Sequence, residues 1–191
     1  MSGGGMEQRR YHIRYERPSI DLPKEKRNTE GYISVMREHP ELLQCVPRAA
    51  RCAEICEAAM NAQGYTDSTE WIRNHGEQFP FVLREMYTEE MCLAFFASEY
   101  AKNYEPMSGY YNGIPYDGKI GIETIPYKYV FRWKSVCEAA VKRNPRFLAG
   151  VPAKYKSIEM CIQALKVDKR QIEYVPQKLL PEVTSTMERA I

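Results

Sequence analysis

Six cysteines are the residues of this chain best suited to nucleophilic or metal chemistry. They are Cys45, Cys52, Cys56, Cys92, Cys137 and Cys161. None forms the CxxC pair that is typical of zinc knuckles and redox motifs. Cys52 and Cys56 would share one helical face, but no His or second Cys pair lies at ligand spacing nearby. The pattern predicts no metal site and no cofactor, and it favours small buried thiols.

The three histidines, His12, His39 and His75, are the candidate general bases. A Cys-His pair would make the protein an enzyme, and such partners meet in space and not in sequence. His39, however, aligns with Asn144 and Asp168, which are typical helix-start residues. The common phosphate-binding, hydrolase and protease motifs are absent. We therefore expect no catalytic residue, and an enzyme with a Cys, His and carboxylate site stays as an alternative.

The densest aromatic cluster lies between residues 100 and 133. Turn dipeptides within it favour a small β-hairpin near 108–122. Tyrosines on such a loop suit a binding surface, because they supply contact area at little cost in conformational entropy. We predict a partner-binding site at Tyr104, Tyr110, Tyr111 and Tyr116. The alternative is that aromatic residues of this segment continue the core, as we expect for Trp133.

The elements that must position these residues are degenerate copies of one short repeat. Cys137 and Cys161 are 24 residues apart, and a hydrophobic residue four positions later and a Val-Pro pair recur at the same interval. The frame also appears near the N-terminus, where Val46-Pro47 aligns with Val151-Pro152 and Cys56 aligns with Cys161. Poorer copies lie between these segments.

Each copy predicts a long helix, a short helix and a corner. Ser157 is a natural N-cap, and the hydrophobic spacing after it indicates a long amphipathic helix. A shorter helix opens at Asn144-Pro145 or at Asp168. It ends at Val-Pro, because proline forces the preceding residue out of the helical region and removes a backbone donor. Stacked copies predict an all-α fold, either a short α-solenoid or an irregular bundle of degenerate ~24-residue repeats.

The repeat also predicts how the chain is divided. We expect a basic N-terminal arm or strap over 1–29, a helical-repeat domain over 30–181 with insertions near 62–78 and 100–124, and a C-terminal tail over 182–191. The arm is basic and punctuated by proline, so it either lies on the first repeat or engages an acidic partner.

The segment AVKRNPRFLAGVP, which begins at residue 140, resembles a family of short bacterial helical repeats of unknown function. Copies in that family read roughly as AV-x-x-N, hydrophobic residues and then VP. The resemblance covers about residues 30 to 180, with good motifs in the first and last copies. It implies a helical-repeat fold and no catalytic residue. Such repeats occur in host-associated bacteria, including in secreted effectors, so the resemblance permits delivery into a host cell without requiring it.

Composition narrows the function further. A formal charge of +2 is too balanced for a general binder of phosphate backbones, which argues against nucleic acid as partner. No apolar run is long enough to span a bilayer, and we expect a cytoplasmic protein. The prediction is a non-enzymatic protein-protein interaction module that uses the repeat scaffold and the Tyr-rich insertion. The alternatives are a secreted bacterial effector enzyme and a nucleic-acid-binding protein.

Overall fold

Long and short helices alternate along the chain. The computed structural model describes residues 20, 22–103, 110–111, 114–115 and 127–189. The α-helices are α1 (Thr29–Glu38), α2 (Ala53–Met60), α3 (Ser68–Asn74), α4 (Glu89–Ala97), α5 (Glu99–Asn103), α6 (Tyr127–Val130), α7 (Lys134–Arg143), α8 (Ile158–Val167) and α9 (Leu180–Arg189). The 3-10 helices are η1 (Lys24–Lys26), η2 (Pro40–Cys45), η3 (Arg48–Ala50), η4 (Gly76–Phe81), η5 (Arg84–Met86), η6 (Pro145–Gly150) and η7 (Lys169–Tyr174). The predicted all-α fold is confirmed.

Two short strands lie within the segment where the sequence favoured a hairpin. They are β1 (Tyr110–Tyr111) and β2 (Ile114–Pro115). The strands pair in antiparallel fashion, with Tyr110 opposite Pro115 and Tyr111 opposite Ile114. Residues 112–113, which join the two strands in the sequence, lie outside the described part of the chain.

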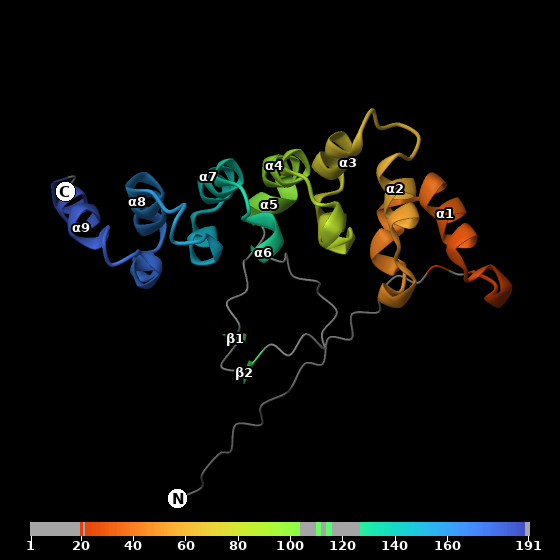
Figure 1. Ribbon diagram of the computed structural model, residues 1–191, viewed down its shortest axis with the longest axis horizontal. Helices are drawn as coiled ribbons and strands as arrows, with labels where there is room; N and C mark the ends of the chain where they lie inside the picture. Colours follow the sequence, from red (N-terminus) through yellow and green to blue (C-terminus); the bar gives the residue numbers. More distant parts are fainter. Residues whose placement is uncertain (1–19, 21, 104–109, 112–113, 116–126, 190–191) are drawn as a thin grey trace, which may run out of the picture.

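The long helices stand side by side in one row, which runs from α1 to α9 in Figure 1. In this row α4 packs directly against α7, and α7, α8 and α9 follow as successive neighbours. The short helices form a second row, in which η2 contacts η4 and η6 contacts η7. The α5 helix contacts η4 and so takes the place of a short helix after α4. Each unit therefore buries one side of itself against the next, as expected of a solenoid.

Polar side chains cap the N-termini of α1, α3, α4 and α8. The side chains of Asn28, Asp67, Thr88 and Ser157 each accept a hydrogen bond from a backbone N–H in the first turn. Such a bond satisfies a donor that has no partner within the helix. The predicted cap at Ser157 is confirmed.

The residue four positions after the N-cap of each long helix faces the core. The recurrence of cysteine at this position explains the spacing of the periodic cysteines. The N–H of the residue at this position donates to the carbonyl of the cap residue in every long helix. The residues at this position are Tyr32, Cys56, Trp71, Cys92, Cys137, Cys161 and Val183, and all are buried. The periodic cysteines are therefore mainly small core side chains, whereas Cys45 and Cys52 lie outside this column and are half-buried.

Each short helix ends at a valine in extended conformation. Val46, Val82, Val151 and Val175 have ψ between 126° and 144°. Their N–H groups donate to the carbonyl three residues earlier, and the chain then turns toward the next long helix. Proline follows three of these valines and leucine follows Val82. The predicted extended corners are confirmed.

The predicted helix-start residues of the short helices divide into two groups. Asn144 and Asp168 accept hydrogen bonds from the N–H of Arg146 and Arg170. His39 occupies the same position but makes no side-chain capping bond. Its ring instead lies 3.3 Å from a carboxylate oxygen of Glu41, so the position is shared while the capping interaction is not.

Two segments that the sequence assigned to an insertion and to the tail contain helices. Residues 62–78, expected as an insertion, contain α3, whose Trp71 and Ile72 are completely buried and which packs against α4. Residues 182–189, expected as part of a tail, belong to α9, where Val183 is buried and Met187 packs against the core. Each segment buries an apolar face against a neighbour, so both extend the row of long helices.

The described part of the N-terminal arm lies on α1. Ile20 and Leu22 pack against the core, and Arg27 donates to the carbonyl of Leu22 at 2.8 Å. The carbonyl of Lys26 approaches Gly31 so closely that a Cβ on this glycine would collide with it. Gly31 therefore allows the strap to sit directly on the helix. No helix in the described part of the chain is long and apolar enough to cross a membrane.

Candidate interaction surface

The corners that follow the short helices contact one another along one edge of the solenoid. The guanidinium carbon of Arg51, in the first corner, lies 5.0 Å from the centre of the Phe81 ring at the start of the next corner. The guanidinium carbon of Arg84 lies 5.8 Å from the centre of the Tyr129 ring, which belongs to the segment before α7. These pairs join residues that are 30 and 45 positions apart in the sequence.

Hydrogen bonds continue the same edge toward the C-terminus. Arg132 donates to the backbone carbonyl of Tyr87 at 2.7 Å. The Tyr155 hydroxyl donates to the backbone carbonyl of Arg132 at 3.0 Å. Lys156 donates to the backbone carbonyl of Tyr174 at 2.7 Å, and burial lowers the pKa of this lysine. Every corner from η2 to η7 is thus linked to its neighbour.

Cations also lie over aromatic rings within the corners. The guanidinium carbon of Arg132 is 4.5 Å from the centre of the Trp133 ring, and the ammonium nitrogen of Lys154 is 4.6 Å from the centre of the Tyr155 ring. The negative face of a ring attracts a cation and limits the positions that the cation samples.

We call the surface formed by the linked corners the corner edge. Its residues are Arg51, Phe81, Arg84, Tyr129, Arg132, Trp133, Lys154, Tyr155, Lys156, Tyr174 and Lys178.

The corner edge presents charge outward and rings inward. The cations of Arg84, Arg132, Lys154 and Lys178 are exposed. The five rings of the corner edge are half-buried and pack against the core. The corners that carry the four exposed cations lead into α4, α7, α8 and α9, which are consecutive neighbours in the row of long helices. Each of these four corners therefore contributes one exposed cation to the corner edge, and Lys156 adds a half-buried one.

The basic excess is concentrated in the C-terminal half. Residues 127–178 contain twelve Lys and Arg against four Asp and Glu, whereas residues 22–103 contain nine against thirteen. Acidic residues of the N-terminal half include Glu85 in the second corner and Glu89 and Glu90 in the first turn of α4. Carboxylates in a first turn stabilise the helix dipole. The C-terminal part of the corner edge therefore lies in the half of the described chain that has the basic excess.

The predicted tyrosine site lies beyond the described side chains. Tyr104 and Tyr116 are outside the described residues, and only the backbone of Tyr110 and Tyr111, in β1, is described. Their role as partner-binding residues stays a prediction. Trp133 packs against the core, as expected, and one face of its ring is covered by Arg132.

The cysteines are not activated as nucleophiles. Burial raises the pKa of all six thiols, and it raises the pKa of Cys92 and Cys137 to about 12. A catalytic cysteine needs the opposite shift, because the thiolate is the reactive form. Among the described residues, no three His, Cys, Asp or Glu side chains gather so that they could hold a metal ion.

His75 takes part in a local aromatic cluster. Its Nε2 lies 2.5 Å from the Tyr65 hydroxyl, and its Nδ1 lies 3.5 Å from a carboxylate oxygen of Glu77. The His75 ring centre is 5.8 Å from that of the buried Trp71. The residue ends α3 and precedes η4, so these contacts hold the turn between the two helices together.

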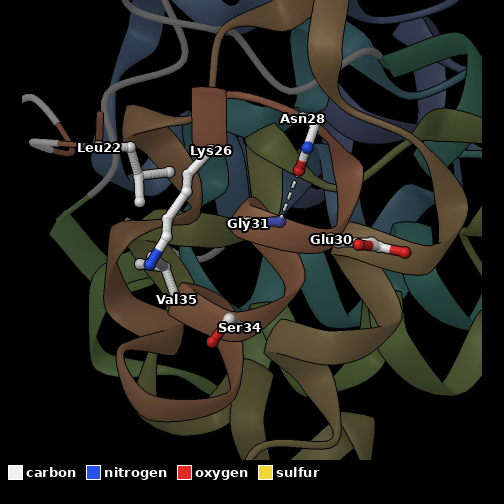
Figure 2. Close-up of a pocket in the computed structure, with 7 residues that line it drawn as sticks. All are labelled: Leu22, Lys26, Asn28, Glu30, Gly31, Ser34 and Val35. Carbon is white, nitrogen blue, oxygen red and sulfur yellow. Dashed lines mark hydrogen bonds between the residues drawn. The ribbon is translucent and has the colours of Figure 1, made fainter. Parts of the chain in front are cut away.

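A cavity of about 320 Å³ lies between the N-terminal strap and α1 (Figure 2). It is lined by Leu22, Lys26, Asn28, Glu30, Gly31, Ser34 and Val35. The Asn28 side chain that borders it already accepts the N–H of Gly31 at 2.9 Å. One cation, one carboxylate and one hydroxyl make up the remaining polar lining, and this set does not converge on a single ligand group as binding pockets do.

Sequence reasoning missed the corner edge, although one signal was present. Basic residues follow three of the corner positions closely, in VPRAAR at 46–51, VLR at 82–84 and VPAKYK at 151–156. The rings that these cations contact come mostly from other units, so the cation–ring pairs could not be predicted from local sequence.

No protein-family model, no curated protein and no solved structure matches this chain.

Proposed function

We propose that this protein is a non-enzymatic interaction scaffold whose corner edge binds an acidic segment of a partner protein. The observation that carries the proposal is the line of cations held over rings and linked from corner to corner. Cations that are already positioned lose little conformational entropy when a carboxylate binds. Charge complementarity of this kind provides specificity and fast association.

The described cysteines and His75 favour a scaffold over an enzyme. The thiols of the described cysteines have raised pKa values, and the side chain of His75 serves a helix turn. A helical repeat, in contrast, builds an extended surface from many similar units. An interaction surface can be built from the corners that recur in successive units. A catalytic site would instead need residues that depart from the repeat.

The Tyr-rich insertion would enlarge the same surface. The chain leaves the described helices after α5 and returns at α6, whose Tyr129 belongs to the corner edge. The predicted contact residues Tyr104, Tyr110, Tyr111 and Tyr116 lie 13 to 25 positions before Tyr129 in the sequence. Tyrosines next to a charged rim match the usual composition of protein interfaces.

Nucleic acid is the second candidate, and the basic C-terminal half favours it. The rings of the corner edge argue against it, because they are half-buried and their faces are covered by the protein's own cations. Binding of single strands depends on rings that are free to stack on bases. The acidic excess of residues 22–103 would also repel a long phosphate backbone.

The test compares two variants with the same net charge. The edge variant carries Arg84→Glu, Lys154→Glu and Lys178→Glu. The control variant carries Lys142→Glu, Lys166→Glu and Lys169→Glu. These are exposed lysines in the last turns of α7 and α8 and at the start of η7. A ten-residue helix is about 15 Å long, so the two sets of charges are well separated.

Binding of a fluorescent glutamate-rich peptide is measured by anisotropy at low salt. We expect the edge variant to weaken binding by at least about tenfold, from three lost contacts of roughly 0.5–1 kcal/mol each. The control variant should change it by less than about threefold. Equal losses in both variants would show a general charge effect and contradict a specific site. A third variant, with alanine at Tyr110, Tyr111 and Tyr116, tests the insertion and should weaken capture of the natural partner without changing the melting temperature.

A further inference from the structure

We infer that the corner edge recognises an extended acidic segment that has one carboxylate in every third position, an inference that rests on the proposed function and specifies its partner. The exposed cations of the corner edge are Arg84, Arg132, Lys154 and Lys178. Each lies at the corner before one of four long helices that pack in succession. The edge therefore offers a regular row of charges and not a cluster.

The spacing of this row follows from helix packing. Neighbouring helices in contact lie about 8–10 Å apart. A chain in the extended polyproline II conformation advances about 3.1 Å per residue with three residues per turn, so every third side chain points the same way and lies about 9 Å farther along. A segment of ten residues with carboxylates at positions 1, 4, 7 and 10 would place one carboxylate at each of the four corners.

Internal bonds hold part of this row in place. Arg132 donates through Nη2 to Tyr87 and through Nε to the carbonyl of Tyr129 at 2.9 Å, and its side chain is still exposed. A guanidinium has five N–H donors, so donors remain for a carboxylate. Lys154 lies over Tyr155, and the hydroxyl of that ring is bonded to the neighbouring corner. Arg132 and Lys154 are thus held relative to each other across a unit boundary.

An extended partner fits better than a helical one. A bound helix lays an apolar face into a hydrophobic groove. Among the described residues the exposed large hydrophobic side chains are Tyr100, Val167 and Ile172, and none belongs to the corner edge. Backbone carbonyls at the corners already accept hydrogen bonds from the protein itself, as those of Tyr87 and Tyr174 do. Binding would therefore come from the carboxylates and not from an added β-strand.

The test uses ten-residue peptides of identical composition, four glutamates and six serines, labelled with fluorescein. One peptide has glutamate at positions 1, 4, 7 and 10, and the other has all four at positions 1 to 4. Anisotropy titrations are made with the full chain, the edge variant and the control variant. We expect the spaced peptide to bind the full chain about fivefold or more tightly than the block peptide, because fewer carboxylates of the block peptide reach a corner. The control variant should keep this preference and the edge variant should lose it.

The outcomes separate this inference from the proposed function. Equal affinities for the two peptides, with both weakened in the edge variant, would overturn the spacing rule and leave the acidic partner in place. Tighter binding of a stable helix with glutamate at every seventh position would overturn the extended conformation. Failure of every acidic peptide to bind, or tighter binding of a ten-nucleotide single strand of DNA, would overturn the proposed function itself.

Discussion

Replacing Leu148 by alanine tests whether the short helices form a continuous second layer. Leu148 is 0% exposed, and its carbonyl accepts the N–H of Val151 at the corner. Ile172 holds the equivalent position in the last short helix, since its carbonyl accepts the N–H of Val175. Ile172 is nevertheless 46% exposed. The same position in two units thus differs in burial, because no further short helix covers η7 in the described part of the chain.

The two substitutions should lower the free energy of unfolding by very different amounts. Leu148→Ala removes a completely buried side chain and leaves a cavity, which typically lowers the free energy of unfolding by about 2–5 kcal/mol. Ile172→Ala removes a side chain that is half in water and leaves an open surface, so we expect a loss of at most about 1 kcal/mol. For a chain of this length, 1 kcal/mol corresponds to roughly 2–4 °C in melting temperature. Leu148→Ala should therefore lower it by about 4–20 °C, and Ile172→Ala by less than about 4 °C.

Thermal and urea unfolding followed by circular dichroism measure both effects. The far-ultraviolet spectrum at low temperature should be the same for both variants and the parent chain. Equal destabilisation by the two substitutions would show that Ile172 is covered in solution, and the explanation based on the last unit would fail. A negligible effect of Leu148→Ala would contradict the two-layer packing itself.

Three further perturbations test other parts of the fold. Iodoacetamide should alkylate Cys92 and Cys137 very slowly at pH 8 in the folded protein and quickly in denaturant, because burial raises their pKa to about 12; fast labelling of either in the folded state would contradict their placement. The Arg170 guanidinium beside Asp168 holds the pKa of that carboxyl below its ordinary value of 3.8, so its contribution to stability is complete above this pH and is lost as pH falls through the lowered folded-state pKa. Asp168→Asn keeps a capping side chain and should make urea stability less sensitive to acid in that range; an unchanged pH profile would refute the role of the pair. Gly31→Ala should lower the free energy of unfolding by about 1–3 kcal/mol, because the new methyl group collides with the strap, and an unchanged urea midpoint would show that the strap is not held there.

Local sequence was sufficient to predict the structure wherever a residue determines the backbone conformation within a few positions of itself. Ser157 caps α8 through the N–H of Met160, and Val151 turns the chain before Pro152, as their types predict. These effects involve neighbours within a few residues, and they recur in each unit with the same physical cause. The long-helix and short-helix rhythm was therefore predictable without knowledge of the packing.

The unit formed by α3 and η4 shows where sequence comparison failed. Its core position is occupied by Trp71, whereas the equivalent position in α2, α4, α7 and α8 holds cysteine. The short interval between α2 and α3 also lacks a short helix. Neither change prevents a helix from stacking, because an apolar residue of another size can fill the same position if its neighbours adapt. The copies of the repeat were aligned by their cysteines, and residues 62–78, which have none, were therefore treated as an insertion.

The sequence by itself determined the helical repeat, the caps, the extended valine corners and the burial of periodic cysteines, because each depends on local geometry or on the apolar face of one helix. Only the tertiary structure decided that Arg84 lies over Tyr129, that Arg132 reaches Tyr87, and that the corner cations form one row. These contacts join positions 45 residues apart. Their distance depends on which helices stack as neighbours, and that order is set by the packing of whole faces and not by any single residue.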